Sequence, residues 1–161
     1  MKTKLVKSIL APLVVAGALV SMVAATATEQ GTEGGRLQGT WEMQITLTDC
    51  AGHVIRSFPS LIEFVRGGTI VESNAGTPQA LKTPGEGVWR HTADSNYAFR
   101  FKFFTFDAQN VFTGWTIISG ETTVDETGDA NTGSATVEVY DPNGVLVATV
   151  CASTVGTRFE L

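Results

Sequence analysis

The chain has 161 residues, of which 43% are hydrophobic and 17% are charged, and its formal net charge is −5. This length suits one domain, and the ordinary apolar content does not favour disorder. An acidic balance, with 11 Lys and Arg against 16 Asp and Glu, argues against a surface that follows nucleic-acid phosphates. We therefore expect one folded domain with no nucleic-acid partner.

The first 27 residues have the features of a signal peptide. A basic start is followed by an apolar run over residues 9–25 and by a small-x-small sequence that ends at Ala27. A cut after Ala25 and an uncleaved membrane anchor are the alternatives. No cysteine lies directly after the cleavage region, which argues against a lipid-anchored lipoprotein. We expect cleavage and an exported protein, periplasmic or extracellular, without membrane attachment after cleavage.

The rest of the chain is expected to be nearly all β. Residues 28–37 are polar and rich in Gly and Glu, which predicts a flexible spacer before a single domain at residues 38–161. In that domain β-branched residues dominate and helix-favouring residues are scarce. No window in it has the apolar spacing of an amphipathic helix.

Eight strand-like runs follow one another in this domain. In the first, residues 41–48, apolar and polar residues alternate with a period of two, which is typical of a strand with one buried face. Turn-forming residues separate most neighbouring runs, so most connections are expected to be hairpins. The other runs are residues 61–66, 69–73, 87–92, 97–106, 111–124, 134–140 and 145–159.

Two irregularities interrupt this pattern. The phase of the aromatic residues changes near Phe103 and Phe104, which predicts a β-bulge there. The connections at residues 51–60 and 75–86 are longer than a hairpin. In an up-and-down meander these are the first and third connections, so both are expected at the same end of the sheet. That end would be covered by loops, and the other end would be closed by tight turns.

The two cysteines indicate that the strands form a closed barrel. In an exported protein, Cys50 and Cys151 are expected to form a disulfide, and two unrelated thiols are the alternative. In an antiparallel pair, the residue numbers of facing residues have a constant sum. The sum for Cys50 and Cys151 differs by only two from the sum for Trp41 and Arg158, so the two pairs fit one strand pairing as diagonal neighbours. The first and last strands would therefore be neighbours. Eight meandering strands whose ends pair form a closed antiparallel up-and-down barrel.

Gly39-Thr40-Trp41, at the start of the first strand, resembles the G-x-W signature of the calycins, the superfamily of lipocalins, fatty-acid-binding proteins and avidins. A basic residue near the end of the last strand packs over the tryptophan in that superfamily, and Arg158 stands at this position. The chain is also similar to small exported bacterial proteins of unknown role. The resemblance implies a calycin-like barrel in which Gly39, Trp41 and Arg158 form the floor. An immunoglobulin-like sandwich is the structural rival, but its buried tryptophan follows the first cysteine more closely than Trp89 does here.

Candidate catalytic residues are few. His53 and His91 lie outside any zinc-binding or hydrolase motif, and no nucleotide-binding fingerprint is present, so no cofactor is expected. An inward Glu72 with His91 or Arg90 across the barrel is the one acid–base arrangement that the sequence offers. We expect Glu72 to point outward, because an inward carboxylate is costly unless it is paired.

The acidic turn at residues 125–133 offers oxygen ligands for calcium from Asp125, Asp129 and Asn131. Its spacing departs from the EF-hand pattern, and hairpin turns favour the same residue types for backbone reasons. We expect a solvated turn, with weak calcium binding as the alternative.

Three functions suit such a barrel. A binding module would hold a small apolar or aromatic molecule at its loop-covered mouth, whereas an isomerase- or cyclase-type enzyme would need inward ionisable groups. A structural or interaction barrel would be filled by its own aromatic side chains. We favour the binding module over an enzyme. The residues expected to contact the ligand are Val54, Phe58 and Leu81 on the long loops and Tyr97, Phe99, Phe101 and Trp115 in the interior.

Overall fold

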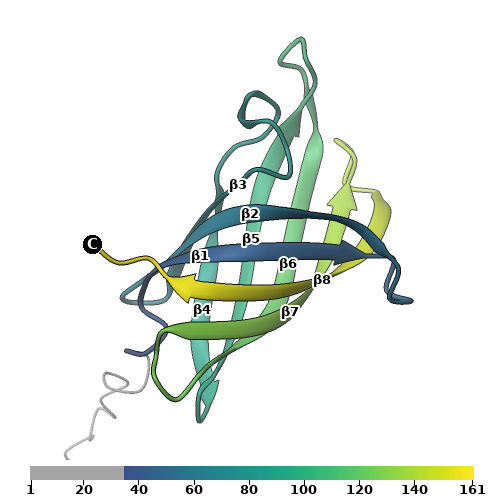
Figure 1. The fold of residues 1–161 in the computed structure, drawn as a ribbon. Helices are drawn as coiled ribbons and strands as arrows, with labels where there is room; N and C mark the ends of the chain where they lie inside the picture. Colours follow the sequence, from purple (N-terminus) through teal and green to yellow (C-terminus); the bar gives the residue numbers. More distant parts are fainter. Residues whose placement is uncertain (1–34) are drawn as a thin grey trace, which may run out of the picture.

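A computed structural model describes residues 35–161, so the expected signal peptide and most of the spacer lie outside the described residues. Eight antiparallel strands form a closed barrel in chain order, and β1 pairs with β8 to complete it (Figure 1). This confirms the all-β, up-and-down barrel. Within residues 35–161 no helix is long and apolar enough to cross a membrane. The elements are β1 (Gly39–Thr48), β2 (Val54–Val65), β3 (Thr69–Asn74), the 3₁₀ helix η1 (Gln79–Leu81), β4 (Gly85–Ala93), β5 (Asn96–Phe106), β6 (Phe112–Val124), β7 (Ala130–Tyr140) and β8 (Leu146–Arg158).

The main difference from the expected strands is in β2. Residues 54–60, expected within a long loop, form the first half of this strand and pair with β1, so the β1–β2 connection is a short turn. Pro59 is an unusual residue within this strand, because proline cannot donate to a sheet hydrogen bond. It is tolerated because β3 pairs with β2 only from Ser60 onward, which leaves Pro59 on an open edge. Its carbonyl accepts a hydrogen bond from the Ala75 backbone N–H on that side.

The predicted bulge at Phe103 and Phe104 is wrong. The two residues alternate as in a regular strand, with Phe103 buried inside and Phe104 exposed outside, and the register shifts only between Thr105 and Phe106. The apparent change of phase arises because the outer face of β5 also carries aromatic residues. Phe104 and Phe106 both pack edge-on against Phe112 of β6.

One end of the barrel, called the floor here, is closed by tightly packed side chains around Trp41, which is fully buried. The Trp41 indole N–H donates a hydrogen bond of 2.8 Å to the Leu37 carbonyl. Leu37, which was expected as the last residue of the spacer, is itself fully buried. The other buried apolar residues at this end include Phe64, Ile70, Trp89, Tyr97 and Val124.

Arg158 covers the Trp41 ring from β8. The two residues face each other in the β1–β8 register, and the guanidinium carbon lies 4.3 Å from the ring centre. Its N–H groups donate to the backbone carbonyls of Gln38 and Gly128 at 2.8 and 2.6 Å. Gly39, at a φ of 117°, leaves room for this side chain, since a Cβ there would lie 3.0 Å from the guanidinium. The tryptophan–arginine contact thus joins the first strand, the last strand and the β6–β7 turn.

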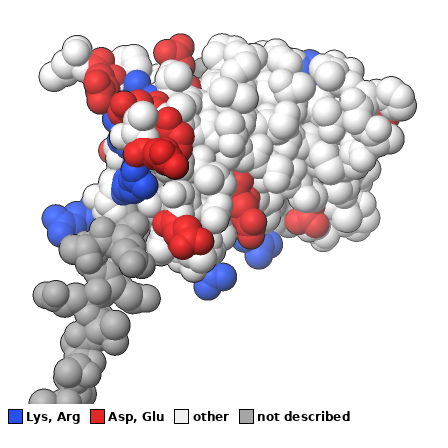
Figure 2. Space-filling view, turned by 60° about the horizontal axis from the view of Figure 1, so that its bottom comes forward, with Lys and Arg blue, Asp and Glu red and all other residues white. Residues whose placement is uncertain are grey.

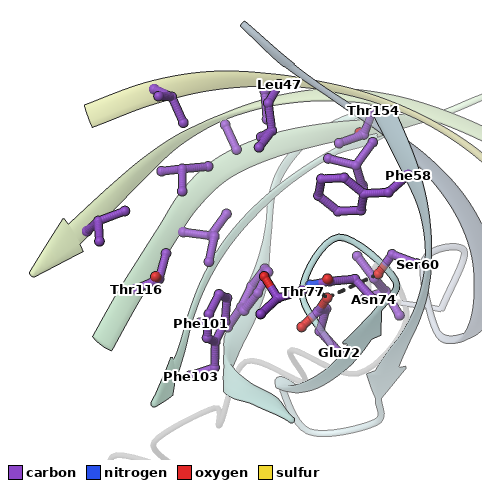
Figure 3. A pocket seen from close by; sticks show the side chains of 18 of the residues that line it. Leu47, Phe58, Ser60, Glu72, Asn74, Thr77, Phe101, Phe103, Thr116 and Thr154 are labelled. Carbon is purple, nitrogen blue, oxygen red and sulfur yellow. Dashed lines mark hydrogen bonds between the residues drawn. The ribbon is translucent and has the colours of Figure 1, made fainter. Parts of the chain in front are cut away.

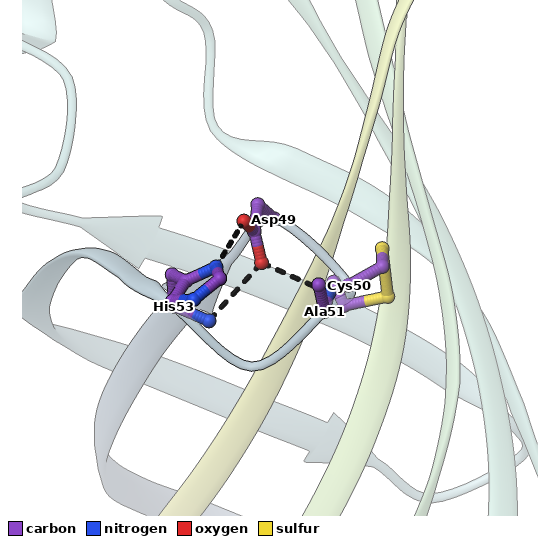
Figure 4. The surroundings of a disulfide bond; sticks show 5 residues. Asp49, Cys50, Ala51 and His53 are labelled. Atoms are coloured by element: carbon purple, nitrogen blue, oxygen red, sulfur yellow. Dashed lines mark hydrogen bonds and ion pairs between the residues drawn. A yellow bond between two sulfur atoms is a disulfide. The ribbon is translucent and has the colours of Figure 1, made fainter.

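The disulfide between Cys50 and Cys151 is formed at the opposite end (Figure 4). The register places Thr48 opposite Cys151, so Cys50 lies two residues beyond the paired part of β1. The Cα atoms of the two cysteines are 4.9 Å apart. The Asp49 carboxylate accepts hydrogen bonds from the backbone N–H groups of Ala51 and His53, which holds the turn that carries Cys50. The predicted pairing is confirmed.

Aspartates in three turns should make stability depend on pH. The pKa of Asp49 is lowered mainly by its side-chain hydrogen bond with His53, that of Asp125 mainly by Thr127, and that of Asp141 mainly by the backbone N–H of Val145. A carboxylate whose pKa is lower in the folded chain stabilises the fold fully above its ordinary pKa of 3.8, and this contribution is lost as the pH falls through the folded value.

We therefore expect the Tm to decrease as the pH falls below the ordinary aspartate range, and Asp141→Asn to reduce that decrease. Asparagine suits the same turn but does not titrate. Thermal unfolding of both proteins over an acid pH series measures the effect. Parallel Tm curves for the two proteins would contradict it.

Candidate functional site

The end of the barrel opposite the floor contains a cavity of about 470 Å³, within the range of about 300–1,000 Å³ typical of small-molecule sites. We call this end the mouth; it carries the β1–β2, β5–β6 and β7–β8 turns and the long β3–β4 connection. Ile55 lines the cavity and is 53% exposed, so the cavity reaches the surface at the start of β2. Most of the wall is apolar, and its aliphatic residues include Ile45, Leu47, Ile118, Val137, Val139 and Val150.

The cavity exists because most large aromatic rings lie elsewhere. Trp89 and Tyr97 belong to the floor, and Trp115 lies on the outer surface. The inner face of β7 and β8 at the mouth carries small side chains, including Ala135 and Ala152. Small residues opposite the phenylalanines of β5 leave the space unfilled.

Three of the expected ligand contacts line the cavity. Phe58, Phe99 and Phe101 line it from β2 and β5, and Figure 3 shows Phe58 and Phe101. Phe58 also supports the β3–β4 connection, because Gly76 lies so close that a Cβ there would be 2.7 Å from the ring. The Arg56 guanidinium lies 5.3 Å from the centre of the Phe58 ring and donates to the Gly76 carbonyl. Arg56 and Phe58 therefore tie the connection to the mouth.

The other four expected contacts do not line the cavity. Val54, 65% exposed, begins β2 and faces solvent, and Leu81 lies in η1. Tyr97 is fully buried in the floor, where its ring packs 5.8 Å from that of Trp89. Trp115 was expected inside, but its neighbour Thr116 lines the cavity, and alternation along β6 therefore turns Trp115 outward.

Trp115 belongs to an aromatic cluster on the outside of β5–β7. Its ring stacks on Tyr140, with the ring centres 5.7 Å apart, and on Phe112. The Lys102 ammonium lies 4.2 Å from the centre of the Trp115 ring. These contacts explain how a half-buried tryptophan is held on the outer face of a sheet.

Charged side chains are unevenly distributed along the barrel. Figure 2 shows most of the Lys, Arg, Asp and Glu side chains of this face gathered toward its left end, while the right end is almost free of them. The β6–β7 turn at the floor contributes Asp125, Glu126 and Asp129, all of them exposed. An uncharged molecule that approaches the mouth over this face meets little charge.

One side of the cavity is polar and centres on Glu72. We call the lining residues Ser60, Glu72, Asn74 and Thr77 the polar wall. The expectation that Glu72 points outward is wrong, because it is only 3% exposed and faces the cavity. It shares a face of β3 with buried Ile70. Gly85, opposite it on β4, leaves the space that the carboxylate occupies.

Glu72 is paired, but not with the expected partner. The Lys82 ammonium lies 3.0 Å from Glu72 Oε2, and the Lys82 side chain is fully buried. The Ser60 hydroxyl and the Asn74 amide donate hydrogen bonds to Glu72 Oε1 (Figure 3). Both charges of this buried pair are therefore compensated, which removes most of the cost of burying the carboxylate.

Sequence reasoning missed Lys82, because it lies in a connection where alternation does not apply. It follows η1 and forms a β-bridge with Thr105 of β5, and the next residue, Thr83, hydrogen-bonds to Phe104. These contacts with β5 direct the lysine into the barrel, where its ammonium lies 4.5 Å from the centre of the Phe103 ring. The one sequence feature that distinguishes Lys82 is that it is one of two lysines in the domain.

The remaining candidates do not line the cavity. His91 contacts the Asp94 carbonyl and the Tyr97 ring at the floor end. Arg90 next to it is exposed, so neither residue reaches Glu72. His53 is on the surface, where its Nδ1 lies 2.7 Å from the Asp49 carboxylate.

The residues considered as calcium ligands make hydrogen bonds within the protein. One carboxylate oxygen of Asp125 accepts hydrogen bonds from three backbone N–H groups of its own turn, including that of Asp129. Asn131 is buried and accepts a hydrogen bond from Thr122. In the described part of the chain, no three His, Cys, Asp or Glu residues form a group that could hold a metal ion.

No protein-family model matches this chain, and no curated protein is similar to it in sequence. The closed eight-stranded barrel is compatible with a calycin-like fold. Function is therefore inferred from the cavity and its lining residues.

Proposed function

We propose that this protein is an exported, calycin-like barrel that binds a small, largely apolar molecule in the cavity at its mouth. The cavity itself carries the proposal: about 470 Å³ of space, mostly apolar in its lining, inside a closed sheet. Sites of this kind bind small molecules by burying their apolar surface, and a rigid scaffold lowers the entropic cost of binding.

Two observations support export and the relation to calycins. The disulfide is typical of oxidising compartments, either the periplasm or the cell exterior, and it agrees with the signal-peptide features of residues 1–27. The contact between Trp41 and Arg158 resembles the floor of calycin barrels.

An isomerase- or cyclase-type activity is the second candidate, since Glu72 is an inward ionisable group. A proton-transfer reaction needs an available acid or base near the substrate. The Glu72 carboxylate is engaged by Lys82, Ser60 and Asn74, and no other Asp, Glu or His of the described chain lines the cavity. This arrangement favours binding over catalysis.

A dye titration tests the proposal. The mature protein should bind an environment-sensitive apolar dye at one saturable site, and Val139→Trp should weaken binding at least about tenfold, because the indole fills the cavity. Thr136→Trp is the matched control, since it adds the same ring to the outer face of β7. If the folded protein gives no saturable signal, or if both variants weaken binding equally, the proposal fails and a filled structural barrel explains the fold better.

A further inference from the structure

The cavity has two chemically different sides. The polar wall, formed by β2, β3 and the β3–β4 connection, carries Glu72 and its neighbours. The facing part, on β7, β8 and β1, is mainly aliphatic and carries Val137, Val150 and Ile45, with Thr154 as its polar member. A molecule that fills the cavity can therefore place its apolar body against one side and a polar group against the cluster of polar side chains on the other.

The polar wall has unused hydrogen-bonding capacity. A carboxylate offers about four acceptor positions on its two oxygens. Ser60 and Asn74 occupy Oε1, and Lys82 occupies one position on Oε2, so among residues 35–161 a second position on Oε2 has no donor. The Thr77 hydroxyl lies on the same wall and makes no hydrogen bond within that part of the chain (Figure 3). One acceptor and one adaptable hydroxyl are thus available to a ligand.

The Glu72–Lys82 ion pair restricts the charge of the ligand group that can lie against the polar wall. An anionic group on the polar wall would face the Glu72 carboxylate, and the Lys82 ammonium is already paired and does not line the cavity. The cation that does line it, Arg56, is exposed, donates to the Gly76 carbonyl and lies over the Phe58 ring, apart from the polar wall. A cationic group would place a second positive charge on one buried carboxylate, with no anion to compensate it. An uncharged donor avoids both costs, and its hydrogen bond to an ionised acceptor is stronger than one between neutral groups.

We infer that the ligand is an apolar molecule with one uncharged hydrogen-bond donor, of the alcohol or phenol class, whose hydroxyl binds Glu72 on the polar wall. This inference rests on the proposed function and names the ligand class of that cavity. Thr77 adds a second polar partner for the same hydroxyl. The aliphatic side accommodates the body of the molecule without hydrogen bonds.

Four probes with one alkyl chain test the inference by displacement of the bound dye. Decanol, decyl methyl ether, decylamine and decanoate share their chain and differ in the head group. We expect decanol to bind at least about tenfold more tightly than the ether, which has the oxygen but no donor, and more tightly than either charged probe. Equal affinities for decanol and the ether, or tightest binding of the amine or the acid, would overturn the inference.

A double variant tests whether Glu72 is the anchor. Glu72→Leu with Lys82→Met removes both members of the buried pair, a change that often preserves the fold. The variant should keep dye binding and lose the preference for decanol over the ether. Thr136→Val, which removes a hydroxyl on the outer face of β7, is the matched control and should keep the preference. A double variant that retains the preference would overturn the role of Glu72.

The two proposals fail in different ways. If the wild-type protein binds neither the dye nor any of the four probes, the proposed function is wrong. If it binds them without distinguishing the hydroxyl, only the ligand class is wrong. The comparison of probes on the wild-type protein needs no variant, so it remains decisive even where the double variant does not fold.

Discussion

Replacing Trp41 with alanine is expected to lower the free energy of unfolding by about 3–5 kcal/mol, the usual cost of truncating a buried tryptophan. The ring is fully buried in the floor, and its N–H bond to the Leu37 carbonyl is lost as well. Urea unfolding of the mature domain measures the change. Trp115→Ala is the matched control, because that ring lies half-buried on the outer face, and we expect it to cost less.

The same experiment tests the contact with Arg158. Arg158→Ala should cost less than Trp41→Ala, and the double variant should cost less than the two single changes together, since both remove one contact of 4.3 Å. Arg158→Lys should be only a partial substitute, because an ammonium cannot cover the ring and reach several carbonyls as the guanidinium does. Fully additive free-energy changes would show that the stacking contributes nothing.

Loss of the disulfide is expected to have the other large effect. The bond closes a loop with a sequence separation of 101 residues, for which the chain-entropy model gives a stabilisation of up to about 4.7 kcal/mol. The double variant Cys50→Ser, Cys151→Ser should therefore unfold at a clearly lower urea concentration. Serine at both positions leaves no free thiol that could form wrong disulfides.

Thiol labelling completes this test. The denatured, unreduced wild-type protein should contain no reactive thiol, and reduction should lower its unfolding midpoint to that of the double variant. Two reactive thiols before reduction, or an unchanged midpoint after it, would contradict the prediction.

The candidate site was only partly predictable from sequence. Phe99 and Phe101 were placed correctly because they alternate with polar residues in β5 and one face had to be inside. Trp115 was placed on the wrong side because β6 has large apolar residues on both faces. Alternation separates the two faces of a strand, but it does not show which face is inside when both are apolar.

Glu72 illustrates a second limit. Its parity with Ile70 indicated an inward position, and the cost of burying an unpaired carboxylate argued against it. Lys82 pairs with the carboxylate and so removes that cost. The position of Lys82, however, depends on a connection that folds back onto β5. No local pattern predicts such a contact.

The sequence by itself determined the all-β class, the order of the strands, the closure of the barrel and the cysteine pairing. These features follow from alternation along each strand, from turn residues, and from the constant sum in an antiparallel register, which are all properties of the linear chain. Only the tertiary structure decided that a cavity remains at the mouth and that Glu72 is paired inside it. Both depend on the sizes and charges of side chains that are distant in the sequence and meet only when all eight strands have closed the barrel.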